Sequence, residues 1–111
     1  MGSSRRVLVT AVLATAFALV GAAPASAEVM PDRRIALEHM VTQDCGSCHG
    51  LTLKGGLGSP LTAGALTNAE PETLATIILD GLPGTAMPPW RPLLTEEEAI
   101  WIARYLKEQP E

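Results

Sequence analysis

The chain has 111 residues, a length that suits one small domain. Twelve acidic and eight basic side chains give a net charge of −4, which argues against nucleic acid and anionic membrane surfaces as partners. Aromatic residues make up only 4% of the chain, so aromatic packing can contribute little to a core.

The first residues predict a secretion signal. "MGSSRR" is a basic start, residues 7–23 form an apolar run, and "PASA" supplies a small-residue cleavage site. We place the cut after Ala27, so that residues 1–27 are a cleaved signal peptide and residues 28–111 form one exported domain. A retained membrane anchor is the alternative, but the run is short for a bilayer span and Pro24 follows it closely. Cleavage leaves 84 residues with a net charge of −6.

The domain is expected to begin with a helix. Pro31 suits the first helical turn, and Ile35, Leu37 and Val41 partly follow helical spacing, so the helix is predicted to run up to Cys45. Residues 50–68 are rich in Gly, Ser, Thr and Pro, which predicts a loop.

A second helix is predicted between Pro71, which suits its start, and Gly81, which suits its end. Residues 82–92, "LPGTAMPPWRP", hold four prolines and a glycine. They are therefore expected to form neither a helix nor a central strand.

The last helix has the strongest signals. Thr95 is a natural N-cap and Glu98 stands three residues later, which is the pattern of a capping box. An apolar stripe follows at Ala99, Ile102, Ala103 and Leu106. No segment shows a convincing strand pattern, so the sequence predicts an all-α domain with about three helices and long loops.

Both cysteines lie in "QDCGSCHG", residues 43–50. A thioredoxin-like dithiol would need a strand before it, and none is predicted. A structural zinc site needs four ligands, and after cleavage only Cys45, Cys48, His39 and His49 could supply them. A Cys45–Cys48 disulfide is possible in an exported protein but leaves His49 unexplained.

Haem attachment accounts for all three residues. The spacing C-x-x-C-H lets Cys45 and Cys48 form thioethers with one edge of the porphyrin and directs His49 to the iron. The porphyrin would also supply the large apolar group that a domain of this size and composition needs. The sequence therefore predicts one covalent haem c.

Met87 is the predicted second axial ligand. It lies 38 residues beyond His49, in the proline-rich loop, where Pro88 and Pro89 limit the conformational freedom of the backbone. Met30, Met40 and His39 are the other candidates, but they lie at the new N-terminus or close before Cys45. With both axial positions filled, the iron has no open site for a substrate, which favours electron transfer over catalysis.

Taken together, "CGSCHG", "LATIILDG", "GTAMPPW" and "LTEEEAIWIARYLKE" resemble a class I monohaem cytochrome c over the whole mature chain. The tail "PGTAMPPWRPLLTEEEAIWIARYL" is similar to the small periplasmic cytochromes encoded beside the haem-cd nitrite reductase of denitrifying bacteria. The resemblance implies a fold in which the first and last helices cross, with Trp101 and Tyr105 against residues 37–41.

The resemblance also implies roles for three further residues. The carbonyl of Pro60 is expected to accept a hydrogen bond from the proximal histidine, His49. Trp90 and Arg91 resemble positions near the haem propionates, the alternative being a packed indole and a solvated arginine.

The expected function is that of a monomeric periplasmic electron carrier, which is not an enzyme. Its partners would be redox proteins that it meets through small transient interfaces, with a nitrite reductase as the candidate. The alternative is an accessory or maturation factor for the haem of that reductase. A thiol oxidoreductase without haem is a second alternative.

Overall fold

The computed structural model describes residues 2, 18, 21 and 27–111. The predicted signal peptide, residues 1–27, falls almost entirely outside the described residues. In the part that is described, no helix has the length and apolar character needed to cross a membrane.

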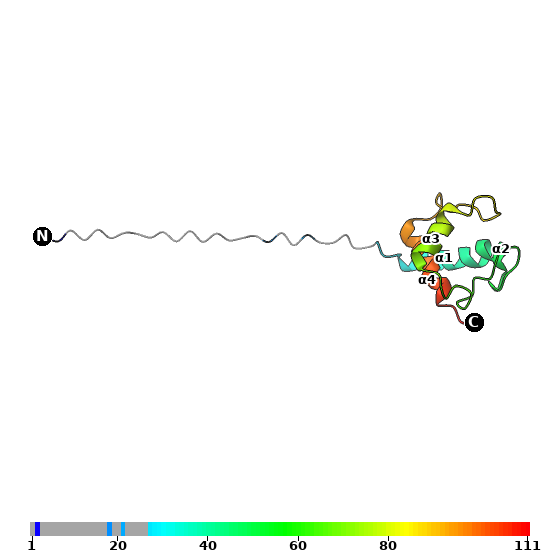
Figure 1. Cartoon of the computed structure of the whole chain (residues 1–111). Coiled ribbons are helices and arrows are strands. Elements are labelled where there is room, and N and C mark those ends of the chain that lie inside the picture. The colour runs from blue at the N-terminus through cyan, green and yellow to red at the C-terminus, as the bar shows by residue number, and fades with distance from the viewer. Residues whose placement is uncertain (1, 3–17, 19–20, 22–26) are drawn as a thin grey trace.

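The described chain is helical, and it contains no strand (Figure 1). The helical segments are α1 (Pro31–Met40), η1 (Val41–Cys45), α2 (Gly46–His49), α3 (Pro71–Asp80) and α4 (Glu96–Lys107). Because α1, η1 and α2 follow one another without a break, they form one continuous helix. The prediction of an all-α domain with about three helices is confirmed.

The first helix runs further than predicted and contains a wide turn. Segment η1 is a π-helix, in which the N–H of Gly46 donates to the carbonyl of Val41 five residues earlier. Such turns insert one extra residue into a helix and are frequent near functional sites. Here the turn follows the part of the helix that holds Leu37, contains Cys45 as its last residue, and precedes the part that holds Cys48 and His49.

Helix α3 has the predicted bounds. Pro71 occupies the first turn and the helix ends at Asp80, immediately before Gly81. Gly81 has φ 68° and ψ −171°, a backbone conformation that is essentially restricted to glycine. The chain therefore turns sharply at Gly81 into the proline-rich loop.

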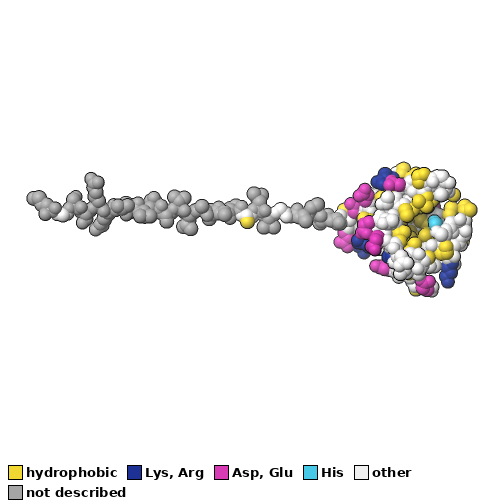
Figure 2. Space-filling view, in the orientation of Figure 1, with side chains coloured by type: hydrophobic (Ala, Val, Ile, Leu, Met, Phe, Trp, Pro, Cys, Tyr) yellow, Lys and Arg dark blue, Asp and Glu magenta, His cyan; other side chains and the backbone are white. Residues whose placement is uncertain are grey.

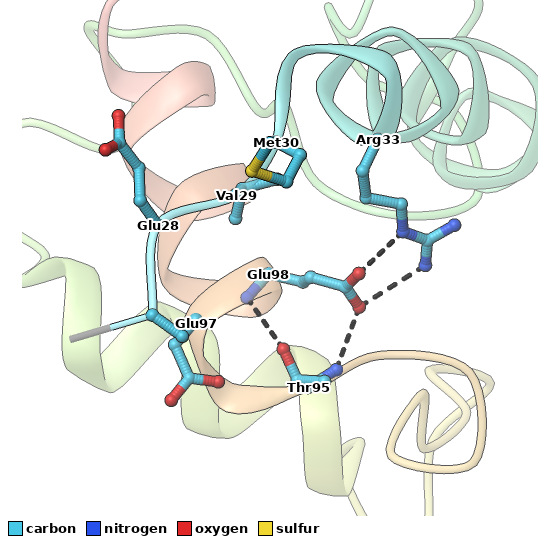
Figure 3. Close-up of a pocket in the computed structure, with 8 residues that line it drawn as sticks. Glu28, Val29, Met30, Arg33, Thr95, Glu97 and Glu98 are labelled. Atoms are coloured by element: carbon cyan, nitrogen blue, oxygen red, sulfur yellow. Dashed lines mark hydrogen bonds and ion pairs between the residues drawn. The ribbon is translucent and has the colours of Figure 1, made fainter.

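Helix α4 begins with the predicted capping box. The Thr95 hydroxyl accepts from the Glu98 N–H at 3.2 Å, and the Glu98 carboxylate accepts from the Thr95 N–H at 2.9 Å. The same carboxylate accepts a hydrogen bond of 2.6 Å from Nε of Arg33 on α1 (Figure 3). This hydrogen bond from Arg33 holds the pKa of Glu98 below its usual range. Glu98 thus caps α4 and also joins it to α1.

The core lies where α4 meets α1 and α3. The predicted stripe of α4 is buried, and the full set of buried core residues is Leu37, Val41, Leu66, Ala75, Leu79, Leu94, Ala99, Ile102, Ala103 and Leu106. Trp101 and Tyr105 pack at its edge with their rings stacked, centroids 5.2 Å apart. Burial, followed by the charge of Glu38 on α1, raises the pKa of Tyr105, as expected where α1 and α4 cross.

Lys107 fastens the loop between α2 and α3 to the end of α4. Its ammonium group donates to the carbonyls of Leu66, Thr67 and Ala69 at 2.7, 3.2 and 2.6 Å. A lysine has three donor hydrogens and no acceptor, so this arrangement uses its full capacity.

Candidate functional site

A cavity of about 560 Å³ opens between the cysteine-bearing helix, the loops on either side of α3, and α4. In Figure 2, hydrophobic side chains gather around a hollow on the visible face of the domain. The lining residues are Met40, Asp44, Cys45, Ser47, Cys48, His49, Leu57, Gly58, Ser59, Leu61, Leu66, Leu74, Ile77, Ile78, Leu82, Thr85, Ala86, Met87, Pro88, Trp90, Leu94, Ile102 and Leu106. A cavity of this volume and largely apolar lining is typical of a cofactor site.

The four residues predicted from the sequence all line this cavity. Cys45 ends η1, Cys48 and His49 belong to α2, and Met87 lies in the loop after α3. Residues 38 positions apart in the sequence thus border one space.

The competing ligand candidates are distributed differently. Met40 lines the cavity from α1, whereas Met30 and His39 do not. His39 is exposed on the surface of α1.

The two cysteines are free thiols, without the disulfide that the sequence left open. Burial, and to a lesser degree the charge of Asp44, raises the pKa of Cys45. A catalytic dithiol needs the opposite, because a lowered pKa makes the nucleophilic thiolate. The zinc alternative also fails, because residues 27–111 contain no group of three His, Cys, Asp or Glu side chains that could hold a metal ion.

The ring of His49 is fixed by a backbone carbonyl. Its Nδ1 lies 2.6 Å from the carbonyl oxygen of Ser59. A carbonyl can only accept, so Nδ1 carries a proton, and in the neutral imidazole this leaves the lone pair of Nε2 available to a metal. The expectation that Pro60 supplies this carbonyl was wrong by one residue. The ring of Pro60 lies beside Gly55, where an added Cβ atom would be 3.4 Å from Cγ of the proline.

Gly58 lies directly against the same ring, and sequence reasoning did not identify it. Its N–H donates to the carbonyl of Cys48 at 2.7 Å, which brings the two backbones together. A Cβ atom at this position would be 2.7 Å from both Nδ1 and Cε1 of His49. The absence of a side chain at Gly58 therefore allows the imidazole to reach Ser59. The glycine-rich stretch at residues 55–58 is the sequence signal for such a close approach.

The backbone of Met87 is fixed by contacts with Leu82 and Gly81, where its loop begins after α3. Its carbonyl accepts from the N–H of Leu82 at 3.2 Å. A Cβ atom at Gly81 would be 2.7 Å from that same carbonyl oxygen and 2.8 Å from the carbonyl carbon of Pro88. Gly81 is thus required both for its backbone conformation and for the space that Met87 occupies.

Trp90 and Arg91 have different surroundings. Trp90 lines the cavity, and its backbone N–H donates to the carbonyl of Ile78 on α3. Arg91 does not line the cavity, and its Nη2 lies 2.6 Å from Oδ1 of Asp80 at the end of α3. Of the pair predicted to lie near haem propionates, only Trp90 faces the cavity.

The residues present fit an iron porphyrin. The wide apolar lining suits the macrocycle, and the two free thiols lie on adjacent turns of one helix. Imidazole and thioether are the side chains that ligate iron in cytochromes c. When bound, such a group supplies reversible one-electron chemistry.

The comparisons with known proteins agree with this fit. The family model "Cytochrome C oxidase, cbb3-type, subunit III" matches residues 34–106. Cytochrome c55X of Paracoccus denitrificans is 64% identical over 74 residues, which cover 67% of this chain and 72% of that protein. Cytochrome c55X of Pseudomonas aeruginosa is 46% identical over 98 residues, which cover 86% and 82% of the two chains.

Solved structures give the same result. The c-type cytochrome NirC is 46% identical with a TM-score of 0.71, over 72% of this chain and 94% of that one. Dihydro-heme d1 dehydrogenase NirN, in complex with DHE, is 32% identical with a TM-score of 0.60, over 66% of this chain but only 16% of that one. The matched family model spans well over half of the sequence. The chain therefore belongs to the c-type cytochrome family, whose cofactor is covalently bound haem c.

Proposed function

We propose that this protein is a periplasmic electron carrier in denitrification, with haem c attached through Cys45 and Cys48 and ligated by His49 and Met87. The observation that carries the proposal is the shared cavity, which all four side chains line. The hydrogen bond from Nδ1 of His49 to the carbonyl of Ser59 supports its role as a ligand, since in the neutral imidazole this bond leaves the lone pair on Nε2.

Attachment is tested by pyridine haemochrome analysis of the purified protein. Two thioether links give the haem c spectrum, and a Cys45→Ala/Cys48→Ala double variant should yield no covalent haem. Haem that is extracted from the wild-type protein by acidified acetone would refute the attachment.

Ligation by Met87 is tested by the near-infrared absorption band that a methionine sulfur produces on ferric haem. We expect the band in the wild-type protein and its loss in Met87→Ala. Met40→Leu is the matched control, because Met40 is the other methionine that lines the cavity. A band that persists in Met87→Ala and disappears in Met40→Leu would identify Met40 as the ligand.

The proposed acceptor is a nitrite reductase, and two observations support this choice. The tail resembles cytochromes encoded with that enzyme, and the solved relative NirC is 46% identical to this chain over the matched residues. The test is stopped-flow mixing of the reduced protein with oxidised nitrite reductase. We expect oxidation of the carrier that accelerates with reductase concentration. A rate no faster than autoxidation would exclude this partner.

A second candidate is a role in making the reductase's haem. The neighbour NirN is by name a dehydrogenase of dihydro-haem d1, and part of it has the fold of this chain. A dehydrogenase must pass its electrons to an acceptor, which an oxidised cytochrome c can be. Reduction of the ferric protein by that dehydrogenase and its substrate, with no exchange with nitrite reductase, would favour this role.

A further inference from the structure

The segment from Leu82 to Met87 is closed into a ring by its own hydrogen bonds. The carbonyl of Leu82 accepts from the N–H of Thr85 at 3.1 Å and also from the hydroxyl of Thr85 at 2.7 Å. The N–H of Leu82 donates to the carbonyl of Met87 at 3.2 Å. Leu82 and Met87 are thereby held next to each other.

The hydroxyl of Thr85 makes a second contact, with Met87 itself. Its Oγ1 accepts from the N–H of Met87 at 3.2 Å. A hydroxyl has one donor hydrogen and two lone pairs, so donation to Leu82 and acceptance from Met87 are compatible. Both backbone polar groups of Met87 are therefore satisfied inside the ring, one of them by a side chain.

No other side chain performs this task in the described structure. Within residues 81–90, the side-chain hydrogen bonds to backbone both belong to Thr85. The three prolines of this segment, Pro83, Pro88 and Pro89, have no N–H to donate. Thr85 also lines the cavity that Met87 borders.

We propose that Thr85 is a positioning residue for Met87, whose hydroxyl holds the loop in the conformation that presents the thioether to the iron. This inference rests on the proposed function, because it takes Met87 to be the axial ligand. Without the hydroxyl, the N–H of Met87 and the carbonyl of Leu82 each lose a partner, and the loop gains conformations in which the sulfur leaves the site.

The experiment measures how easily an added ligand displaces Met87. Imidazole is titrated into the ferric holoprotein, and its binding is followed by loss of the near-infrared band. Thr85→Val keeps the shape of the side chain and removes the hydroxyl, whereas Thr85→Ser keeps the hydroxyl. Thr76→Val is the control, because Thr76 is also exposed and donates to a backbone carbonyl at 3.0 Å, but on α3 and away from the cavity.

We expect imidazole to bind Thr85→Val about three- to tenfold more tightly than the wild-type protein, as the loss of one or two exposed hydrogen bonds predicts. Thr85→Ser and Thr76→Val should stay within about twofold of the wild type, since neither loses a bond to the loop. Far-UV circular dichroism establishes that each variant is folded.

Equal imidazole affinity in Thr85→Val and the wild type, with the band present in both, would overturn the role of Thr85 and leave the proposed function intact. A wild-type protein without the band, or a Met87→Ala variant that keeps it, would overturn the ligation by Met87 and with it this inference.

Discussion

Nδ1 of His49 donates a hydrogen bond of 2.6 Å to the carbonyl of Ser59, across a glycine that leaves no room for a side chain. The contact ties the cysteine-bearing helix to the loop at residues 55–60. It determines which nitrogen of the imidazole faces the cavity, and it depends on Gly58 as much as on the two bonded residues.

The first prediction concerns Gly58. Gly58→Ala places a methyl group against the His49 ring, so we expect the free energy of unfolding to fall by about 1–3 kcal/mol, as in other overpacked sites. The paramagnetic NMR signals of the His49 ring should also shift. Gly46→Ala is the control, because Gly46 has helical φ and its added Cβ would have contacts of 3.5 Å or more. Equal effects of the two substitutions would contradict the steric argument.

The second prediction compares two glycines of the Met87 loop. Both have positive φ, 68° at Gly81 and 79° at Gly84, but no atom lies within 4 Å of a Cβ added at Gly84. Gly84→Ala should therefore cost about 1–2 kcal/mol in backbone strain alone. Gly81→Ala should cost more and weaken the near-infrared band, since its methyl group displaces the Met87 carbonyl. Denaturant unfolding of both holoproteins checks the order, and a larger loss in Gly84→Ala would refute it.

The third prediction concerns the dependence of stability on pH. Arg33 lowers the pKa of Glu98 in the folded protein, so the stabilisation is complete above the pKa of an unfolded glutamate, about 4.3, and is lost as the pH falls through the lower folded value. Glu98→Gln should reduce the free energy of unfolding by about 1–2 kcal/mol at neutral pH. The decrease of this free energy on acidification should also be smaller than in the wild type.

The control for Glu98 is Glu72→Gln. Glu72 lies 3.7 Å from Arg104, and both side chains are more than 60% exposed, so the pair contributes little. Urea titrations between pH 3 and 7 measure both variants. An equal decrease of the free energy of unfolding at acid pH in Glu98→Gln and the wild type would show that the Arg33 contact does not stabilise the fold.

The fourth prediction concerns Lys107. Lys107→Met removes the donor for three carbonyls, so we expect a loss of about 1–3 kcal/mol and faster amide exchange in residues 61–69. Lys107→Arg keeps the charge and should recover part of the loss. Lys54→Met removes the same charge from an exposed loop position and should change stability by less than about 0.5 kcal/mol. Comparable losses of stability at both lysines would mean that removal of the positive charge, rather than of the hydrogen bonds to the three carbonyls, destabilises the protein.

The parts of the fold that follow from local chemistry could be predicted from the sequence. The capping box at Thr95 and Glu98, the bounds of α3 and the buried stripe of α4 all depend on residues a few positions apart. The location of Cys45, Cys48, His49 and Met87 around one cavity was also predictable, because few residues of the chain could supply a second ligand to a haem.

What could not be predicted depends on the exact path of the backbone. The choice of Ser59 over Pro60 is a matter of one residue in a loop whose course is set by Gly55, Gly56 and Gly58. The bonds of Lys107 join positions about 40 residues apart and leave no periodic signal in the sequence. The π-helix at Val41–Cys45 was likewise not predicted, because the helical spacing of the sequence indicates a helix without specifying its type.

The π-helix has a consequence for the direction in which the first helix presents its side chains. In an α-helix each residue turns the chain by about 100°. If the same residues were wound as a regular α-helix, Leu37 could still face α4, but Cys48 and His49 would be turned about a quarter of a revolution around the axis. The wide turn thus sets the angle between the face of the helix that packs in the core and the face that lines the cavity.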